Sequence, residues 1–109
     1  MAKPITITYK DRTYTLEFNR HTVSELEQKG FNLSEIQNKF ATFLPMLFAG
    51  AFTMHHRFVK PDIIEDIYKH IPNKMALLDR LSSLYAEPIN ALFDEPEESE
   101  ENAVWDMEN

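Results

Sequence analysis

The feature that most constrains this chain is a segment, residues 40–54, that is apolar around nearly the whole circumference of a helix. Seven of its side chains recur at helical spacing and form one stripe: Phe40, Phe43, Leu44, Leu47, Phe48, Ala51 and Phe52. A helix of this kind is either the centre of a core or gives its second face to another chain. Few elements in a chain of 109 residues are available to cover both faces, so we expect surplus apolar surface here.

We expect this central helix to run over residues 42–54. Thr42 is the predicted N-cap, because Pro45 then falls in the first turn, where backbone N–H groups have no helical partner.

Residues 5–18 alternate between apolar and polar side chains, which predicts a β-hairpin. The apolar members, on both sides of a turn at residues 10–12, are Ile5, Ile7, Tyr9, Tyr14, Leu16 and Phe18. An isolated two-stranded hairpin is marginally stable, so we expect its apolar face to pack on the helices.

Capping signals place two short helices after the hairpin. Thr22 and Glu25 fit the S/T-x-x-E capping box of a helix that ends at Gly30. Asn32, followed by Glu35, predicts the start of another short helical turn.

Two further helices are expected in the second half of the chain. Pro61 is a favourable first-turn residue for a helix that extends to Ile71. The last helix starts near Lys74, and Pro88 is expected to kink or end it. Three residues extend its apolar stripe beyond this proline: Ile89, Leu92 and Phe93.

The predicted fold class is α+β and mainly helical, with an N-terminal hairpin followed by about four to five helices. One globular domain is expected over residues 1–93, with its helices within 22–93. Of the 18 acidic residues, eight lie in residues 94–109, which contain no Lys or Arg. Because this acidic tail has almost nothing to bury, we expect it to be disordered.

The charge distribution disfavours nucleic acid as a partner. The first 93 residues carry ten acids against all 11 bases, so this body is nearly neutral, and the acidic tail would repel phosphates. No run of about 20 apolar residues is present, so no membrane span is expected.

No catalytic or metal-binding pattern is recognisable. The chain has no cysteine and only two glycines, which excludes thiolate chemistry and a glycine-rich phosphate loop. His55 and His56 are adjacent and cannot share a metal at i, i+4 spacing, while His21 and His70 have no histidine partner. We therefore expect no enzyme activity, no metal and no cofactor.

Two groups of residues are candidates for protein binding. The first is Met46, Ala49 and Met54, which lie off the central stripe and belong either to the core or to an interface. The second is Val104, Trp105 and Met107, the apolar cluster of the acidic tail. Trp105 is the sole tryptophan, and tryptophan is a frequent interface anchor. The alternatives for this cluster are a neutral tail or one that folds back onto the body.

Four stretches in this order carry a resemblance that spans nearly the whole chain. They are ITITYKDRTYTLEFNRHTVSELEQKGF, LPMLFAGAF, LLDRLSSLYAEPINALF and the acidic tail with its Trp motif. The sequence resembles the tail assembly chaperones of long-tailed (siphovirus) phages and of prophages of Gram-positive bacteria.

This resemblance implies a non-enzymatic protein that binds the tape-measure protein and keeps it soluble during tail morphogenesis. It further implies contact with the tail-tube protein, self-association, and a location in the cytoplasm of the bacterial host and not in the mature virion. The alternative is a small acidic inhibitor or adaptor encoded by a mobile element, which acts by binding a host protein.

Overall fold

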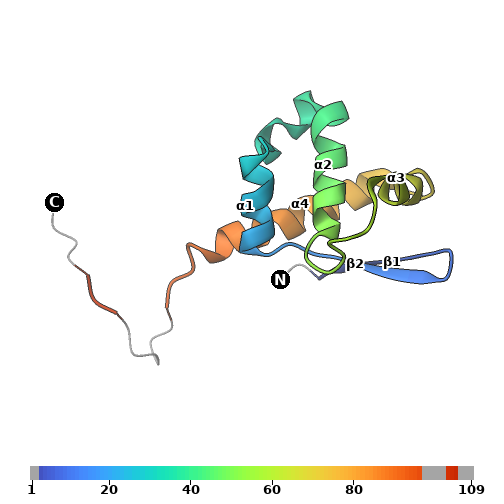
Figure 1. Ribbon diagram of the computed structural model, residues 1–109. Helices are drawn as coiled ribbons and strands as arrows, with labels where there is room; N and C mark the ends of the chain where they lie inside the picture. The colour runs from blue at the N-terminus through green and yellow to red at the C-terminus, as the bar shows by residue number, and fades with distance from the viewer. Residues whose placement is uncertain (1–2, 97–102, 106–109) are drawn as a thin grey trace.

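A computed structural model describes residues 3–96 and 103–105 of the chain (Figure 1). Its elements are, in order, β1 (Ile5–Tyr9), β2 (Arg12–Leu16), α1 (Arg20–Gln28), the 3-10 helix η1 (Leu33–Asn38), α2 (Phe40–Phe52), α3 (Pro61–Lys69) and α4 (Lys74–Ala91). A hairpin thus precedes five helices, with η1 counted among them. This confirms the α+β, mainly helical class.

The hairpin is antiparallel and tightly closed. Ile5 pairs with Leu16 at one end and Tyr9 with Arg12 at the other. The two residues between the strands, Lys10 and Asp11, have φ values of 49° and 64°. Positive φ at both positions is the geometry of a type I′ turn, whose twist matches that of the paired strands.

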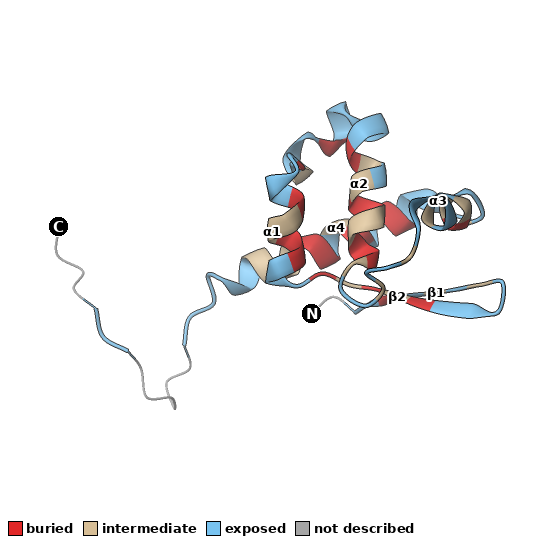
Figure 2. Ribbon diagram, in the orientation of Figure 1, coloured by how far each residue is buried: buried red, intermediate tan, exposed pale blue. Residues whose placement is uncertain are grey.

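The helices and the hairpin surround the core, to which α3 contributes Ile67. Helix α4 contacts both α1 and α2, and β2 contacts α2. Buried residues gather where these elements meet, while the far end of the hairpin is exposed (Figure 2). The largest fully buried side chains are Leu16, Leu47, Phe48, Phe52, Ile67 and Leu81. The hairpin therefore rests on the helices through one face, as expected.

Aromatic rings join the helices through edge-on contacts. Phe31, which follows α1, has its ring centroid 5.0 Å from that of Tyr85 on α4 and 5.4 Å from that of Phe43 on α2. The ring of Phe18, after β2, lies 5.3 Å from Tyr85 on its other side. Burial raises the pKa of Tyr85 to about 12.

The expected capping box of the first short helix was wrong by three residues. Asn19 is the N-cap of α1: its Oδ1 accepts a hydrogen bond from the N–H of Thr22 at 2.8 Å, and its own N–H donates to Thr22 Oγ1 at 2.9 Å. Thr22 is therefore the N3 residue of the box, which leaves Glu25 free to pair elsewhere. The predicted N-cap of η1, Asn32, is confirmed, since its side chain accepts from Ser34 N–H.

The expected bounds of the central helix were also wrong. Helix α2 starts at Phe40 with Lys39 as N-cap, so Thr42 is a helical residue and Pro45 lies inside the helix. Proline has no N–H, so the carbonyl of Ala41 loses its helical partner. Burial of the stripe offsets this loss, because Leu47, Phe48, Ala51 and Phe52 are each at most 2% exposed.

The second half of the chain differs from expectation in three places. Helix α3 ends at Lys69, and Ile71 follows it. Helix α4 continues through Pro88 to Ala91. Leu92 and Phe93 lie beyond the helix and are 53% and 79% exposed, so they do not extend the buried stripe.

The tail begins beyond α4. Residues 94–96 and 103–105 are exposed and belong to no helix or strand. The rest of the predicted disordered tail, residues 97–102 and 106–109, lies outside the described residues. In the part of the chain that is described, no helix is long and apolar enough to cross a membrane.

Candidate protein-binding groove

An apolar groove of about 710 Å³ lies between α2 and α3. Its lining residues are Phe40, Ala41, Leu44, Pro45, Phe48, Ala49, Pro61, Ile64, Glu65, Tyr68 and Lys69. Among these, Glu65 is the single acid and Lys69 the single base, so the surface is suited to apolar contact.

Two helix faces form this groove. Helix α2 contributes two rows of residues spaced by four, which share one side of a helix: Phe40, Leu44 and Phe48, and beside them Ala41, Pro45 and Ala49. Helix α3 contributes Pro61, Ile64 and Tyr68, which follow one another at three or four residues. The apolar surface of both helices therefore continues from the core into the groove.

A ring contact connects the two walls. The ring of Phe48 on α2 lies 5.2 Å from that of Tyr68 on α3, with an interplanar angle of 66°. Phe48 is 2% exposed, while Tyr68 is half-buried. The groove therefore has a core residue at its base and a partly accessible aromatic ring on its wall.

A polar cluster holds α3 against the hairpin turn. Tyr9 Oη donates a hydrogen bond of 2.8 Å to Asp66 Oδ2, and Lys10 Nζ lies 3.5 Å from the same oxygen. These contacts, with the Tyr9 hydrogen bond as the main cause, lower the pKa of Asp66. His70 Nδ1 lies 2.8 Å from the Asp66 carbonyl oxygen and 3.1 Å from Tyr9 Oη. The cluster fixes the wall of the groove that α3 provides.

Two histidines attach the loop between α2 and α3 to β2. His56 Nε2 accepts a hydrogen bond of 2.8 Å from Thr15 N–H, and His55 Nε2 lies 2.8 Å from Glu17 Oε1. Both side chains therefore have structural partners. No group of three or more His, Cys, Asp or Glu residues that could hold a metal ion is found in residues 3–96 and 103–105.

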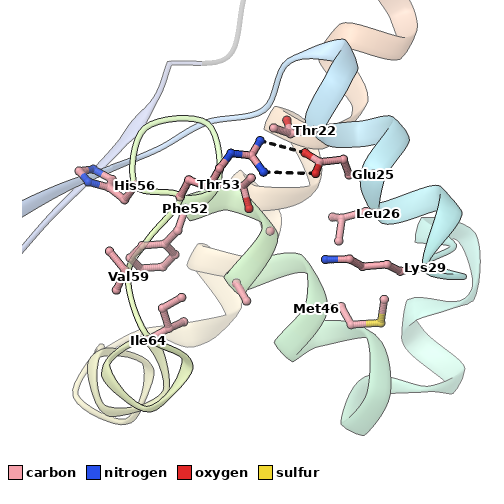
Figure 3. A pocket seen from close by; sticks show the side chains of 13 residues that line it. Thr22, Glu25, Leu26, Lys29, Met46, Phe52, Thr53, His56, Val59 and Ile64 are labelled. Atoms are coloured by element: carbon pink, nitrogen blue, oxygen red, sulfur yellow. Dashed lines mark hydrogen bonds and ion pairs between the residues drawn. The ribbon is translucent and has the colours of Figure 1, made fainter.

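A second pocket, of about 350 Å³, lies between α1 and α2 (Figure 3). Arg57 donates two hydrogen bonds of 3.3 and 3.4 Å to Glu25 there, and they lower the pKa of Glu25. Lys29 of α1 and Met46 of α2 both line this pocket (Figure 3). This pocket combines an ion pair with apolar walls and is half the volume of the groove.

Close packing of α1 on α2 delimits this second pocket. A Cβ atom at Gly50 would lie 2.7 Å from Leu26 Cδ1. A larger residue at position 50 would therefore require the Leu26 side chain to shift.

The three predicted binding residues of the central segment lie in different surroundings. Ala49 lines both the groove and the second pocket. Met46 is half-buried and lines only the second pocket. Met54 lies just beyond α2, is 37% exposed and lines neither.

The predicted binding residues of the tail that the structure describes line neither the groove nor the second pocket. Val104 and Trp105 are 94% and 72% exposed, and residues 103–105 lie away from the helices (Figure 1). Met107 lies outside the described residues.

Most of the groove was absent from the predicted site. Phe40 and Leu44 belong to the apolar stripe, whose members were not among the predicted binding residues, yet Phe40 is 43% exposed and Leu44 half-buried. The rows at spacing four were a usable signal, because apolar side chains on nearly every side of a helix form a surface wider than one neighbouring helix covers.

The fold and the groove define a small helical protein with an open apolar surface suited to protein binding. The chain belongs to a family described as a domain of unknown function (DUF5055), which matches residues 1–109. No curated protein matches the chain, and no solved structure does.

Proposed function

We propose that this chain is a tail assembly chaperone of a long-tailed phage or prophage. In this function it binds the tape-measure protein in the cytoplasm of the bacterial host, keeps it soluble while tail-tube subunits assemble, and is absent from the mature virion. It catalyses no reaction, and its other contacts are with the tail-tube protein and with further copies of itself.

The observation that carries this proposal is the apolar groove between α2 and α3. An amphipathic helix binds by laying its apolar face into a hydrophobic groove. A volume of about 710 Å³ with one acid and one base among its lining residues suits several apolar side chains of such a helix. A tape-measure protein that is not yet enclosed by its tube exposes long helical segments, and these are the ligands we assign to the groove.

The acidic tail supports the same function in a different way. Eight acids and no Lys or Arg lie in residues 94–109, whereas the groove belongs to the nearly neutral body. Like charges on successive bound copies would keep a chaperone–client complex soluble.

Deletion of residues 94–109 separates this function from that of an acidic inhibitor or adaptor. We expect the truncated chain to bind the tape-measure protein still, because the groove is intact, although the complex should be less soluble. An inhibitor that acts through its acids would lose all binding to its target. Complete loss of client binding in the truncated but folded chain would contradict the proposal.

A matched pair of point variants tests the groove itself. Phe40 lines the groove and is 43% exposed, whereas Phe58 is 93% exposed and lines neither pocket. We expect Phe40→Glu to weaken client binding and Phe58→Glu to leave it unchanged. Equal effects of both variants would show that the groove is not the client site.

A further inference from the structure

We propose that the Trp105 segment of one copy of this chain binds in the α2–α3 groove of a second copy. The proposal concerns the free protein and stands without the chaperone function. Where a client helix is present, the client and the tail of a second copy compete for one groove.

The tail offers an apolar ligand that its own chain leaves uncovered. Val104 is 94% and Trp105 72% exposed. A tryptophan ring gains free energy when it enters an apolar pocket, and it loses few rotamers in doing so. The chain has one tryptophan, so burial of this single side chain is directly measurable.

Of the two pockets that contain apolar side chains of α2, the groove suits this ligand better. Its volume is about 710 Å³ against about 350 Å³ for the second pocket. The smaller pocket contains the Arg57–Glu25 ion pair, which an indole ring would desolvate without replacing its hydrogen bonds. The groove presents the Tyr68 ring as an aromatic partner.

Charge complementarity favours the same match. The segment is flanked by Glu100, Glu101, Asp106 and Glu108. Lysines outnumber acids around the groove: Lys69 lines it, Lys74 Nζ lies 5.1 Å from the Tyr68 ring centroid, and Lys39 and Lys60 directly precede the lining residues Phe40 and Pro61. The acids there are Glu65, Asp62 and Glu35, whose Oε2 lies 4.0 Å from Lys39 Nζ. Acids on both sides of an apolar anchor therefore meet a rim with a small excess of lysines.

The geometry of α4 assigns the ligand to a second copy. Tyr68 lies near the first residue of α4, Lys74, and the tail leaves from the opposite end of this helix (Figure 1). An 18-residue helix is about 27 Å long. Thirteen residues separate the end of α4 from Trp105. A random coil of that length would span about 20 Å on average, less than the length of α4, so binding of a tail to its own groove would require a stretched chain. A tail from a neighbouring copy carries no such restriction.

The contact is heterologous, because donor tail and acceptor groove are different surfaces of the same chain. Each copy can donate its tail and accept another at once. The mass in solution should therefore rise beyond that of a dimer as concentration increases.

Two complementary variants test the contact. Trp105→Ala removes the donor and keeps the groove. Phe40→Glu keeps the donor and places an acid in the groove, at an exposed residue that is the first of α2. Each variant alone should remain monomeric by light scattering. Their mixture should form a 1:1 complex in which Trp105 emission shifts to shorter wavelength, because Trp105→Ala supplies an intact groove and no tryptophan.

Circular dichroism should show that both variants are folded, and Phe58→Glu should associate like the wild-type chain. We expect each groove or tail variant to lower the association constant by about 30-fold or more, the loss expected of a central tryptophan anchor.

Three results would overturn the proposal. They are unchanged self-association of Trp105→Ala, no complex in the mixture, and a blue-shifted Trp105 in a wild-type chain that stays monomeric at every concentration. The last result would assign the groove to the tail of the same copy. A wild-type chain that binds no tape-measure protein, together with intact association in the mixture, would contradict the chaperone function alone.

Discussion

The ring of Tyr68 packs edge-on against the ring of Phe48, with centroids 5.2 Å apart. Phe48 belongs to the core of α2, whereas Tyr68 is the half-buried aromatic residue of α3. A substitution of Tyr68 should therefore affect both the stability of the fold and the shape of the groove, because it changes the groove wall formed by α3 while Phe48 stays in the core.

We expect Tyr68→Ala to lower the free energy of unfolding by about 2 kcal/mol through loss of apolar burial and of the ring contact. It should also weaken binding at the groove. Tyr68→Phe is the matched control, since no hydrogen bond of Tyr68 Oη is found in the described part of the chain. Urea denaturation of both variants measures the difference. A Tyr68→Phe variant as unstable as Tyr68→Ala would show that the hydroxyl, and not the ring, carries the contact.

Gly50→Ala should destabilise the protein by about 1 kcal/mol. The new Cβ would lie 2.7 Å from Cδ1 of Leu26, whose side chain is 4% exposed and has little room to move. The higher helix propensity of alanine, worth about 1 kcal/mol, offsets part of this cost.

In a Leu26→Ala background the same substitution should change sign. Leu26→Ala alone lowers stability by about 2–5 kcal/mol, but it removes the atom that Gly50→Ala meets, so the helix propensity of alanine then stabilises α2. A double-mutant cycle of thermal unfolding measures this coupling. Additive effects of the two substitutions would contradict close packing of α1 on α2 at Gly50.

The cap of α1 gives a third prediction. Asn19→Ala should cost about 1 kcal/mol, because it removes the acceptor of the Thr22 N–H group. Asn19→Asp should keep most of the stability, since a carboxylate accepts the same hydrogen bond. An Asn19→Ala variant as stable as the wild-type chain would contradict Asn19 as the N-cap.

Stability should depend on pH through the Tyr9–Asp66 pair. The hydrogen bond from Tyr9, followed by the charge of Lys10, lowers the pKa of Asp66 in the folded chain. A carboxyl whose folded pKa is depressed contributes stability above its unfolded pKa, about 3.9, and this contribution disappears as pH falls through the folded pKa.

The stability advantage of wild type over Asp66→Asn should therefore be full near neutral pH and vanish in acid. Midpoints of thermal unfolding between about pH 7 and about pH 2 measure this difference. Tyr9→Phe, which removes the main cause of the shift, should show a smaller dependence on pH in the same range. A difference between wild type and Asp66→Asn that is independent of pH would contradict this linkage.

Much of the fold could be predicted because local signals were unambiguous. Strict alternation on both sides of residues 10–12 indicated the hairpin, Asn32 marked the start of η1, and Pro61 marked that of α3. The cap of α1 was predicted wrongly, because Thr22 and Glu25 fit the capping-box pattern, whereas Asn19, three residues before Thr22, is the N-cap. Burial of the apolar stripe is a tertiary effect, so the continuation of α2 through Pro45 was not visible in the local pattern.

The candidate site was less predictable than the fold. Helical periodicity identifies the residues that share a face, as it did for Phe40 and Leu44, but it does not tell how far the neighbouring helix extends over them. Helix α3 covers Phe48 and leaves Phe40 43% exposed. Met46 and Met54, chosen because they lie off the stripe, fall outside the groove for the same reason.

Co-expression with the tape-measure protein of the same phage or prophage, followed by light-scattering mass measurement of the soluble fraction, tests the chaperone function most directly. We expect a soluble complex that contains several copies of this chain per tape-measure protein, and we expect Phe40→Glu to reduce its yield while Phe58→Glu does not. A tape-measure protein that stays insoluble beside a free monomer of 12.8 kDa would contradict the chaperone function.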